Sequence, residues 1–216
     1  VLTHGWRFSK DGGKNWSEVR VPHDWAIAGP FDLNAKSGAT GKLPWKGTGM
    51  YSRRLEVSAA DMAEVAKGGR IYINFDGVMA SPEVKLNGKY IGGWDYGYMG
   101  FTLDITDKVY EGKNLLEVSC DTRHHNSRWY PGAGLYRKVR LVTVPQIYVP
   151  VWGTQITTPY VGEEYASVTI KTELVGVPEK SPVTLRTLIR NAEGGVVAEK
   201  CDTRRLYYGM PFEQHL

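Results

Sequence analysis

The sequence predicts an all-β protein made of sandwich-like domains. The first observation is strict alternation: Ile71, Ile73 and Phe75 in RIYINF can share one face of a strand. The second is the presence of turn residues, because dipeptides such as Asn87-Gly88 separate the alternating segments. Short strands at spacings of roughly 8–12 residues, with turn residues between them, are typical of β-sandwiches and barrels.

Seven strands and one helix are expected before residue 145. The strands cover 51–57, 70–78, 83–86, 90–92, 101–105, 115–121 and 135–144. The clearest hairpin is LNGKY, because Asn87-Gly88 supplies the two positive-φ residues that a type I′ turn requires. The helix is AADMAEVA at 59–66, which Ser58 would cap and Gly68-Gly69 would end.

A domain boundary is expected near Pro145, giving domains 1–145 and 146–216. Beyond it, ASVTIKTELV and VTLRTLIR begin a new strand series that resembles the opening of an immunoglobulin-like sandwich. A complete sandwich of that kind needs about 100 residues, and fewer remain. We therefore expect the second domain to be incomplete, and the pattern gives no strand for 202–216.

Composition excludes several function classes. The net charge of +4 comes from 27 basic and 23 acidic residues without a long run of one sign, so no nucleic-acid partner is expected. No apolar segment approaches the roughly 20 residues of a membrane span. Cys120 and Cys201 match no metal or redox spacing, and the five His form no ligand pattern, so neither a metal nor a cofactor is expected. The 7 Trp and 13 Tyr, against 5 Phe, favour a recognition surface.

An ordered set of segments resembles family 2 glycoside hydrolases, most of all the β-galactosidase branch. These segments are GWRFSKDG (5–12), VPHDW (21–25), GTGMYSRRLEV (47–57), FDGVMASPEVKLNGKYIGGWDYGYMGF (75–101), ITDKVYEGKNLLEVSCD (105–121), SRWYPGAGLYRKVRLV (127–142) and WGTQITTP (152–159). They cover most of residues 5–160, and their order makes the resemblance specific.

The resemblance implies a layout and a role. It implies a galactose-binding-like jelly roll, then a truncated immunoglobulin-like sandwich, with both catalytic glutamates on a TIM barrel of about 250 residues that this chain lacks. The chain would be a catalytically inactive amino-terminal fragment that supports the barrel and helps to shape the sugar subsite. Its partners would be that barrel and, through the full-length enzyme, a β-galactoside-like carbohydrate. The alternative is a stand-alone carbohydrate-binding module or adhesin.

The stretch NSRWYPGAGLYR carries the main site hypothesis. Arg128 offers a planar set of donors for sugar hydroxyls, and Trp129 offers a flat apolar face. The alternative is structural, with Trp129 filling the end of a sandwich. Residues 122–134 are expected to connect two strands across that end, since a strand should begin at Leu135.

Four further residues complete the expected sugar rim. Asp24 lies in VPHDW, where the alternative is that its carboxylate accepts backbone N–H bonds and ties down a loop. Trp94 and Asp95 lie in GGWDYGYMGF, whose aromatic rings would otherwise cover a sandwich edge. Lys46 aligns where some family members place an Asn that contacts the substrate, and this departure leaves its role open.

Overall fold

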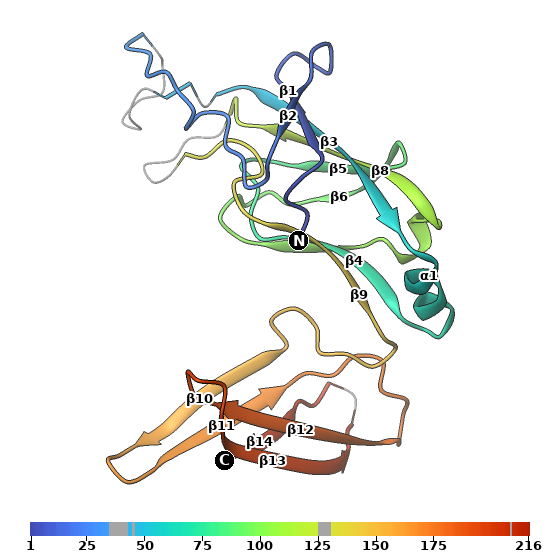
Figure 1. Cartoon of the computed structure of the whole chain (residues 1–216), viewed down its shortest axis with the longest axis vertical. Helices are drawn as coiled ribbons and strands as arrows, with labels where there is room; N and C mark the ends of the chain where they lie inside the picture. Colours follow the sequence, from blue (N-terminus) through green and yellow to red (C-terminus); the bar gives the residue numbers. More distant parts are fainter. Residues whose placement is uncertain (35–42, 45, 125–130, 208) are drawn as a thin grey trace. The chain divides into compact units, whose positions relative to one another are not determined.

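The computed structural model describes residues 1–34, 43–44, 46–124, 131–207 and 209–216, which form two compact units, Val1–Thr143 and Val144–Leu216. The regular secondary structure of both units is almost entirely β-strand, which confirms the all-β class (Figure 1). The single α-helix of the described residues, α1 (Ala59–Ala66), belongs to the first unit.

The first unit is a sandwich of two sheets (Figure 1). The larger sheet has the strand order β2-β1-β3-β8-β5-β6, and the smaller has the order β7-β4-β9. The larger sheet comprises β1 (Trp6–Ser9), β2 (Ser17–Val19), β3 (Thr48–Val57), β5 (Glu83–Leu86), β6 (Lys89–Gly93) and β8 (Gly112–Asp121). The smaller comprises β4 (Arg70–Phe75), β7 (Phe101–Asp104) and β9 (Val139–Val144).

One apolar core joins the inner faces of the two sheets. Strands β3 and β8 pair over ten residues each, from Thr48 opposite Asp121 to Val57 opposite Gly112. Alternate residues of these strands face the core, as the period of two requires. The core also takes residues from β1, β4 and β5; its largest fully buried side chains include Trp6, Tyr51, Phe75, Leu55, Ile71, Ile73, Leu86 and Leu116.

The local signals read from the sequence give the expected elements. Asn87 and Gly88 adopt φ of 52° and 78° between β5 and β6, as a type I′ turn requires. The α1 helix has the predicted bounds, and Ser58 caps it. Asp61 completes a capping box by accepting from Ser58 N at 2.9 Å, and its other oxygen accepts from Thr143 Oγ1 at 2.7 Å.

The expectation that a strand begins at Leu135 is wrong. The strand β9 begins at Val139, and residues 135–138 bond to other segments. His23 N donates to Leu135 O at 2.8 Å, and Asp76 N donates to Lys138 O at 2.9 Å. Leu135 is therefore buried without belonging to a strand.

The amino-terminal hairpin of β1 and β2 was not predicted from the sequence. Its loop is held by Asp11, which accepts from Lys14 N, Asn15 N and Ser9 Oγ. The backbone bond from Asn15, followed by those from the Ser9 hydroxyl and the Asn15 amide, lowers the pKa of Asp11 to about 2. Both strands are too short to show a clear alternation of apolar and polar residues. The pattern that predicts longer strands therefore does not detect them.

The second unit contains two small sheets. Strands β10 (Thr154–Val161), β11 (Ala166–Thr172) and β14 (Phe212–His215) form one, and β12 (Pro182–Arg190) with β13 (Val196–Arg205) forms the other. The buried Gln214 joins them, since Thr187 Oγ1 donates to its Oε1 at 2.6 Å. Gln214 Nε2 donates to Leu185 O and to Asp202 Oδ2, each at 3.1 Å.

The segment 202–216 contains the end of β13 and all of β14. Among its described residues, Phe212 is the one fully buried apolar side chain, and the next buried side chain is the polar Gln214. That pattern does not read as a strand from sequence.

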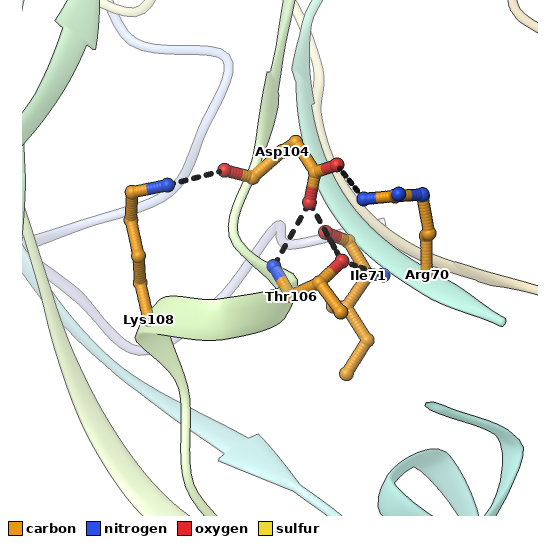
Figure 2. A network of polar contacts seen from close by, with 5 residues as sticks. All are labelled: Arg70, Ile71, Asp104, Thr106 and Lys108. Carbon is orange, nitrogen blue, oxygen red and sulfur yellow. Dashed lines mark hydrogen bonds and ion pairs between the residues drawn. The ribbon is translucent and has the colours of Figure 1, made fainter. Parts of the chain in front are cut away.

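A network of hydrogen bonds and ion pairs surrounds Asp104, the last residue of β7 in the smaller sheet of the first unit (Figure 2). Asp104 Oδ1 accepts from Thr106 N at 3.0 Å and from Thr106 Oγ1 at 2.6 Å, while Oδ2 pairs with Arg70 Nη1 at 2.8 Å. Thr106 Oγ1 in turn accepts from Ile71 N at 3.0 Å. Burial acts to raise the pKa of Asp104, but the Thr106 bonds and Arg70 outweigh it and lower the pKa.

We predict that Asp104→Ala lowers the free energy of unfolding by about 1–2 kcal/mol, the scale for losing a capping carboxylate. Denaturant unfolding at pH 7 measures this. Asp107→Ala is the control, because Asp107 is exposed and has no bonded partner among the described residues. Because the folded pKa of Asp104 is depressed, the difference between wild type and Asp104→Ala is present above the unfolded pKa of about 3.9. This stability difference should shrink as pH falls through the folded pKa of Asp104. Equal losses of stability in Asp104→Ala and Asp107→Ala would contradict the role of Asp104.

Candidate functional site

Several strands of the larger sheet of the first unit end at one edge, which we call the loop edge. At this edge β3 begins at Thr48 opposite Asp121, where β8 ends. Neighbouring β5 begins at Glu83, which lies opposite Gly93, the last residue of β6. The connections that leave these strand ends carry Lys46 and the pair Trp94-Asp95. The fold therefore places these residues, separated by about 50 positions in the sequence, along one edge.

Arg128 and Trp129 lie outside the described residues, but the segments on both sides of them are placed. Thr122, which is fully buried, accepts from Gly47 N at 2.9 Å through its hydroxyl, and Thr122 N donates to Gly47 O at 2.9 Å. On the other side, Gly134 pairs with Met79 in an isolated bridge. The position of Arg128 and Trp129 at a solvent-facing end of the sandwich stays a prediction.

The Pro-Gly-Ala-Gly turn needs glycine because of its backbone conformation. Gly132 and Gly134 have φ of 45° and 112°, which favours glycine. A Cβ on Gly134 would lie 2.0 Å from Tyr51 Oη, so no side chain fits there. Backbone conformation and close packing therefore account for both glycines.

Asp24 connects two loops. Its Oδ1 accepts from Ala26 N at 2.8 Å and from Ile27 N at 3.2 Å, and its Oδ2 accepts from Ala133 N at 3.1 Å. The carboxylate thereby ties the segment after VPHDW to the PGAG turn, 109 positions later. This is the tie-down role that the sequence offered as the alternative; a contact from Asp24 to substrate stays a prediction.

The neighbours of Asp24 belong to the core. Trp25 stacks on Phe8 with ring centroids 5.6 Å apart, and a Cβ on Gly49 would lie 2.5 Å from the Trp25 ring. His23 Nδ1 lies 2.8 Å from Tyr51 Oη. Burial lowers the pKa of His23, while the charge of Asp24 acts in the opposite direction. The His23 ring is therefore a neutral packing partner near pH 7.

Trp94 and Asp95 follow β6 directly and are exposed. Trp94 stacks on Phe101, and Tyr136 Oη donates to Gly97 O at 2.9 Å, which anchors the segment that follows. Tyr96 and Tyr98 contact each other with ring centroids 5.6 Å apart. In this segment, the Trp94 ring therefore rests on the core, Tyr96 is exposed and Tyr98 is half-buried.

Lys46 is exposed and comes directly before Gly47, whose backbone bonds to Thr122. Sequence reasoning missed Glu83 and Tyr90, which lie next to Trp94 on β5 and β6. Only the register of the Asn87-Gly88 hairpin could have placed them there. Within the described residues, no group of three or more His, Cys, Asp or Glu could hold a metal ion, and no helix there is long and apolar enough to cross a membrane.

Residues 15–145 match the family model of the sugar-binding domain of family 2 glycosyl hydrolases. This match covers more than half of the chain. The chain belongs to glycoside hydrolase family 2.

Two relatives that are named as glycosidases extend the comparison. A β-galactosidase of Bacteroides ovatus is 36% identical over 207 residues, which cover 90% of this chain and 24% of the relative. A β-glucuronidase of Bacteroides fragilis is 30% identical over 154 residues, covering 66% of this chain and 20% of the relative. The chain therefore spans about a quarter or less of the length of these relatives.

A solved structure agrees with this assignment. The crystal structure of a glycosyl hydrolase family 2 member from Bacteroides cellulosilyticus superposes with a TM-score of 0.84 at 29% identity. The superposition covers 99% of this chain and 29% of the other. This family 2 chain therefore shares the fold of a corresponding part of a longer protein.

We predict that Asp24→Ala lowers the exchange protection of the Ala133 amide by about 10-fold or more, because the variant loses the acceptor of that amide. Hydrogen exchange followed by NMR measures it at a single site. Asp32→Ala is the matched control, since Asp32 accepts from Asn34 N within its own loop. If the Ala133 amide kept its protection in Asp24→Ala, its hydrogen bond to Asp24 would contribute little to the stability of the two loops.

Proposed function

We propose that this chain is the non-catalytic amino-terminal part of a retaining β-galactosidase-like hydrolase. It would support a catalytic barrel and help to shape the sugar subsite. The observation that carries the proposal is the 36% identity to the Bacteroides ovatus β-galactosidase over 90% of the chain. Glucuronidases are also among the relatives, so the β-galactoside is the finer part of the proposal.

Two domains would share this role. Residues 1–145 would form the galactose-binding-like jelly roll, and residues 146–216 would begin an immunoglobulin-like sandwich. Retaining glycosidases use two carboxyl groups about 5–5.5 Å apart, and in our proposal both belong to the barrel. The chain would then contribute no catalytic residue.

The rim of the sugar subsite would come from the loop edge. We propose that Arg128 donates to substrate hydroxyls, with Trp129, Asp24, Lys46, Trp94 and Asp95 nearby. The bonds that Ala133 N donates to Asp24 and that Gly47 N donates to Thr122 support this, because they anchor both flanks of the connection that carries Arg128. Fixed flanks reduce the conformational entropy that is lost when a ligand binds.

An activity assay tests this proposal by comparing turnover by the full-length protein with turnover by the chain alone. We expect the full-length protein to hydrolyse nitrophenyl β-galactoside in preference to the β-glucuronide and the β-mannoside. The 216-residue chain alone should give no turnover above a blank. Turnover by the chain that disappears in Asp24→Ala or Asp95→Ala would refute the proposal, and preference for the β-glucuronide would refute its finer part.

In the full-length enzyme, Arg128→Ala should lower kcat/KM by about 1–3 kcal/mol of transition-state stabilisation, the scale for a charged hydrogen bond. Arg123→Ala is the control in the same connection, because Arg123 forms an exposed pair with Asp121 and should change kcat/KM little. Equal activity of Arg128→Ala and wild type would mean that Arg128 has no contact with the transition state.

A further inference from the structure

A hollow of about 420 Å³ opens beside the edge strand β6. We call it the Trp94 hollow; its side chains come from Ser81, Pro82, Glu83, Tyr90, Trp94 and Asp95. The volume lies within the range of roughly 300–1,000 Å³ that small-ligand sites occupy. The hollow combines two exposed aromatic rings with two carboxylates, and the described residues that line it include no basic side chain.

The Trp94 ring is held in place by the core. It stacks on Phe101 with centroids 6.4 Å apart and planes at 12°, and Phe101 stacks on Phe75 at 4.8 Å and 15°. Phe75 is fully buried and Phe101 is 7% exposed, whereas Trp94 is 44% exposed. The three rings thus form a column that runs from the core to the surface. Its outermost ring presents a fixed apolar surface to solvent.

The floor of the hollow is shaped by glycine. A Cβ on Gly93 would lie 2.2 Å from Pro82 O, so the two backbone segments approach more closely than any side chain permits. The same Cβ position lies 3.5 Å from Tyr90 Oη, which places that hydroxyl beside the floor. Tyr90 is 63% exposed, so its ring borders the hollow without filling it.

The charge of the hollow is negative. Glu83 and Asp95 are exposed, and neither carboxylate forms an ion pair or hydrogen bond with the part of the chain that the structure describes. Ionised carboxylates only accept hydrogen bonds, so they suit the hydroxyl donors of a sugar. A carboxylate or sulfate on the ligand would meet two like charges.

We propose that the Trp94 hollow is a carbohydrate-binding site for a neutral hexopyranose unit of an oligosaccharide. The apolar C–H face of the sugar stacks on the exposed face of Trp94, and its hydroxyls donate to Glu83 and Asp95, with Tyr90 Oη as a further partner. This inference rests on the rim role proposed above for Trp94 and Asp95 and extends it to Glu83 and Tyr90. All four residues belong to the present chain, so we expect binding to be measurable without the barrel. The test measures binding and not turnover, so the site and the proposed hydrolase function can fail separately.

The test uses the 216-residue chain and three probes: β-1,4-galactotetraose, tetragalacturonic acid and tetralysine. Titrations followed by NMR should show saturable binding of the neutral tetrasaccharide with a Kd on the order of 1 mM, as expected for a small open site. The Trp94 indole N–H signal should shift during the titration. Tetragalacturonic acid should bind at least about 10-fold more weakly because of like-charge repulsion. No saturable binding of either saccharide, preference for the acidic one, or binding of tetralysine alone would overturn the proposal.

Matched variants assign the binding to this hollow. Trp94→Ala should lower the affinity for the neutral probe by at least about 10-fold, as expected for an aromatic anchor. Trp152→Ala should leave it unchanged, because Trp152 is 91% exposed and belongs to the second unit. Glu83→Gln and Asp95→Asn keep the shape and remove the charge, so the double variant should lose the discrimination against tetragalacturonic acid. These two substitutions keep the test decisive if Trp94→Ala disturbs folding, and unchanged discrimination would overturn the assignment.

Discussion

The ten-residue pairing of β3 with β8 is the constraint on which the rest of the first unit depends. It fixes which residues of both strands face the core, because a shift of one residue would turn every buried side chain to solvent. Tyr51 and Leu116 are consequently fully buried. The same register places the start of β3 beside the end of β8, so the connections that leave both strands meet at the loop edge. The arrangement of the candidate site residues therefore follows from the register of this sheet.

The loops at this edge are held by few but specific contacts. Asp24 reaches Ala133, Thr122 reaches Gly47, and Gly134 lies against Tyr51. Each contact joins segments that are far apart in the sequence. The first two use a buried or partly buried polar group that would be costly to leave unpaired. A site on such loops is positioned by the sandwich beneath it, which is how loops of β-sandwiches come to carry function.

The column of Phe75, Phe101 and Trp94 shows a different way of positioning a surface group. Here packing against the core orients an exposed ring and no hydrogen bond is needed. GGWDYGYMGF suggested aromatic rings over a sandwich edge, but only the structure separates Trp94, which is fixed by the stack, from Tyr96, which is 56% exposed. Glu83 and Tyr90 joined the hollow through the register of β5 and β6, a relation that no local pattern expresses.

The sequence by itself determined the features whose causes are local. Asn87-Gly88 determined a tight turn through its backbone conformation, Ser58 determined the start of α1, and the alternation around Ile71 determined a strand with one buried face. Only the tertiary structure decided that residues 135–138 bond outside a sheet, that the short strands β1 and β14 exist, and that Gln214 joins two sheets. The physical reason is the distance between partners along the chain. A turn or cap is stabilised by neighbours within a few residues, whereas His23 and Leu135, or Phe75 and Phe101, acquire their contacts only after the sheets have formed.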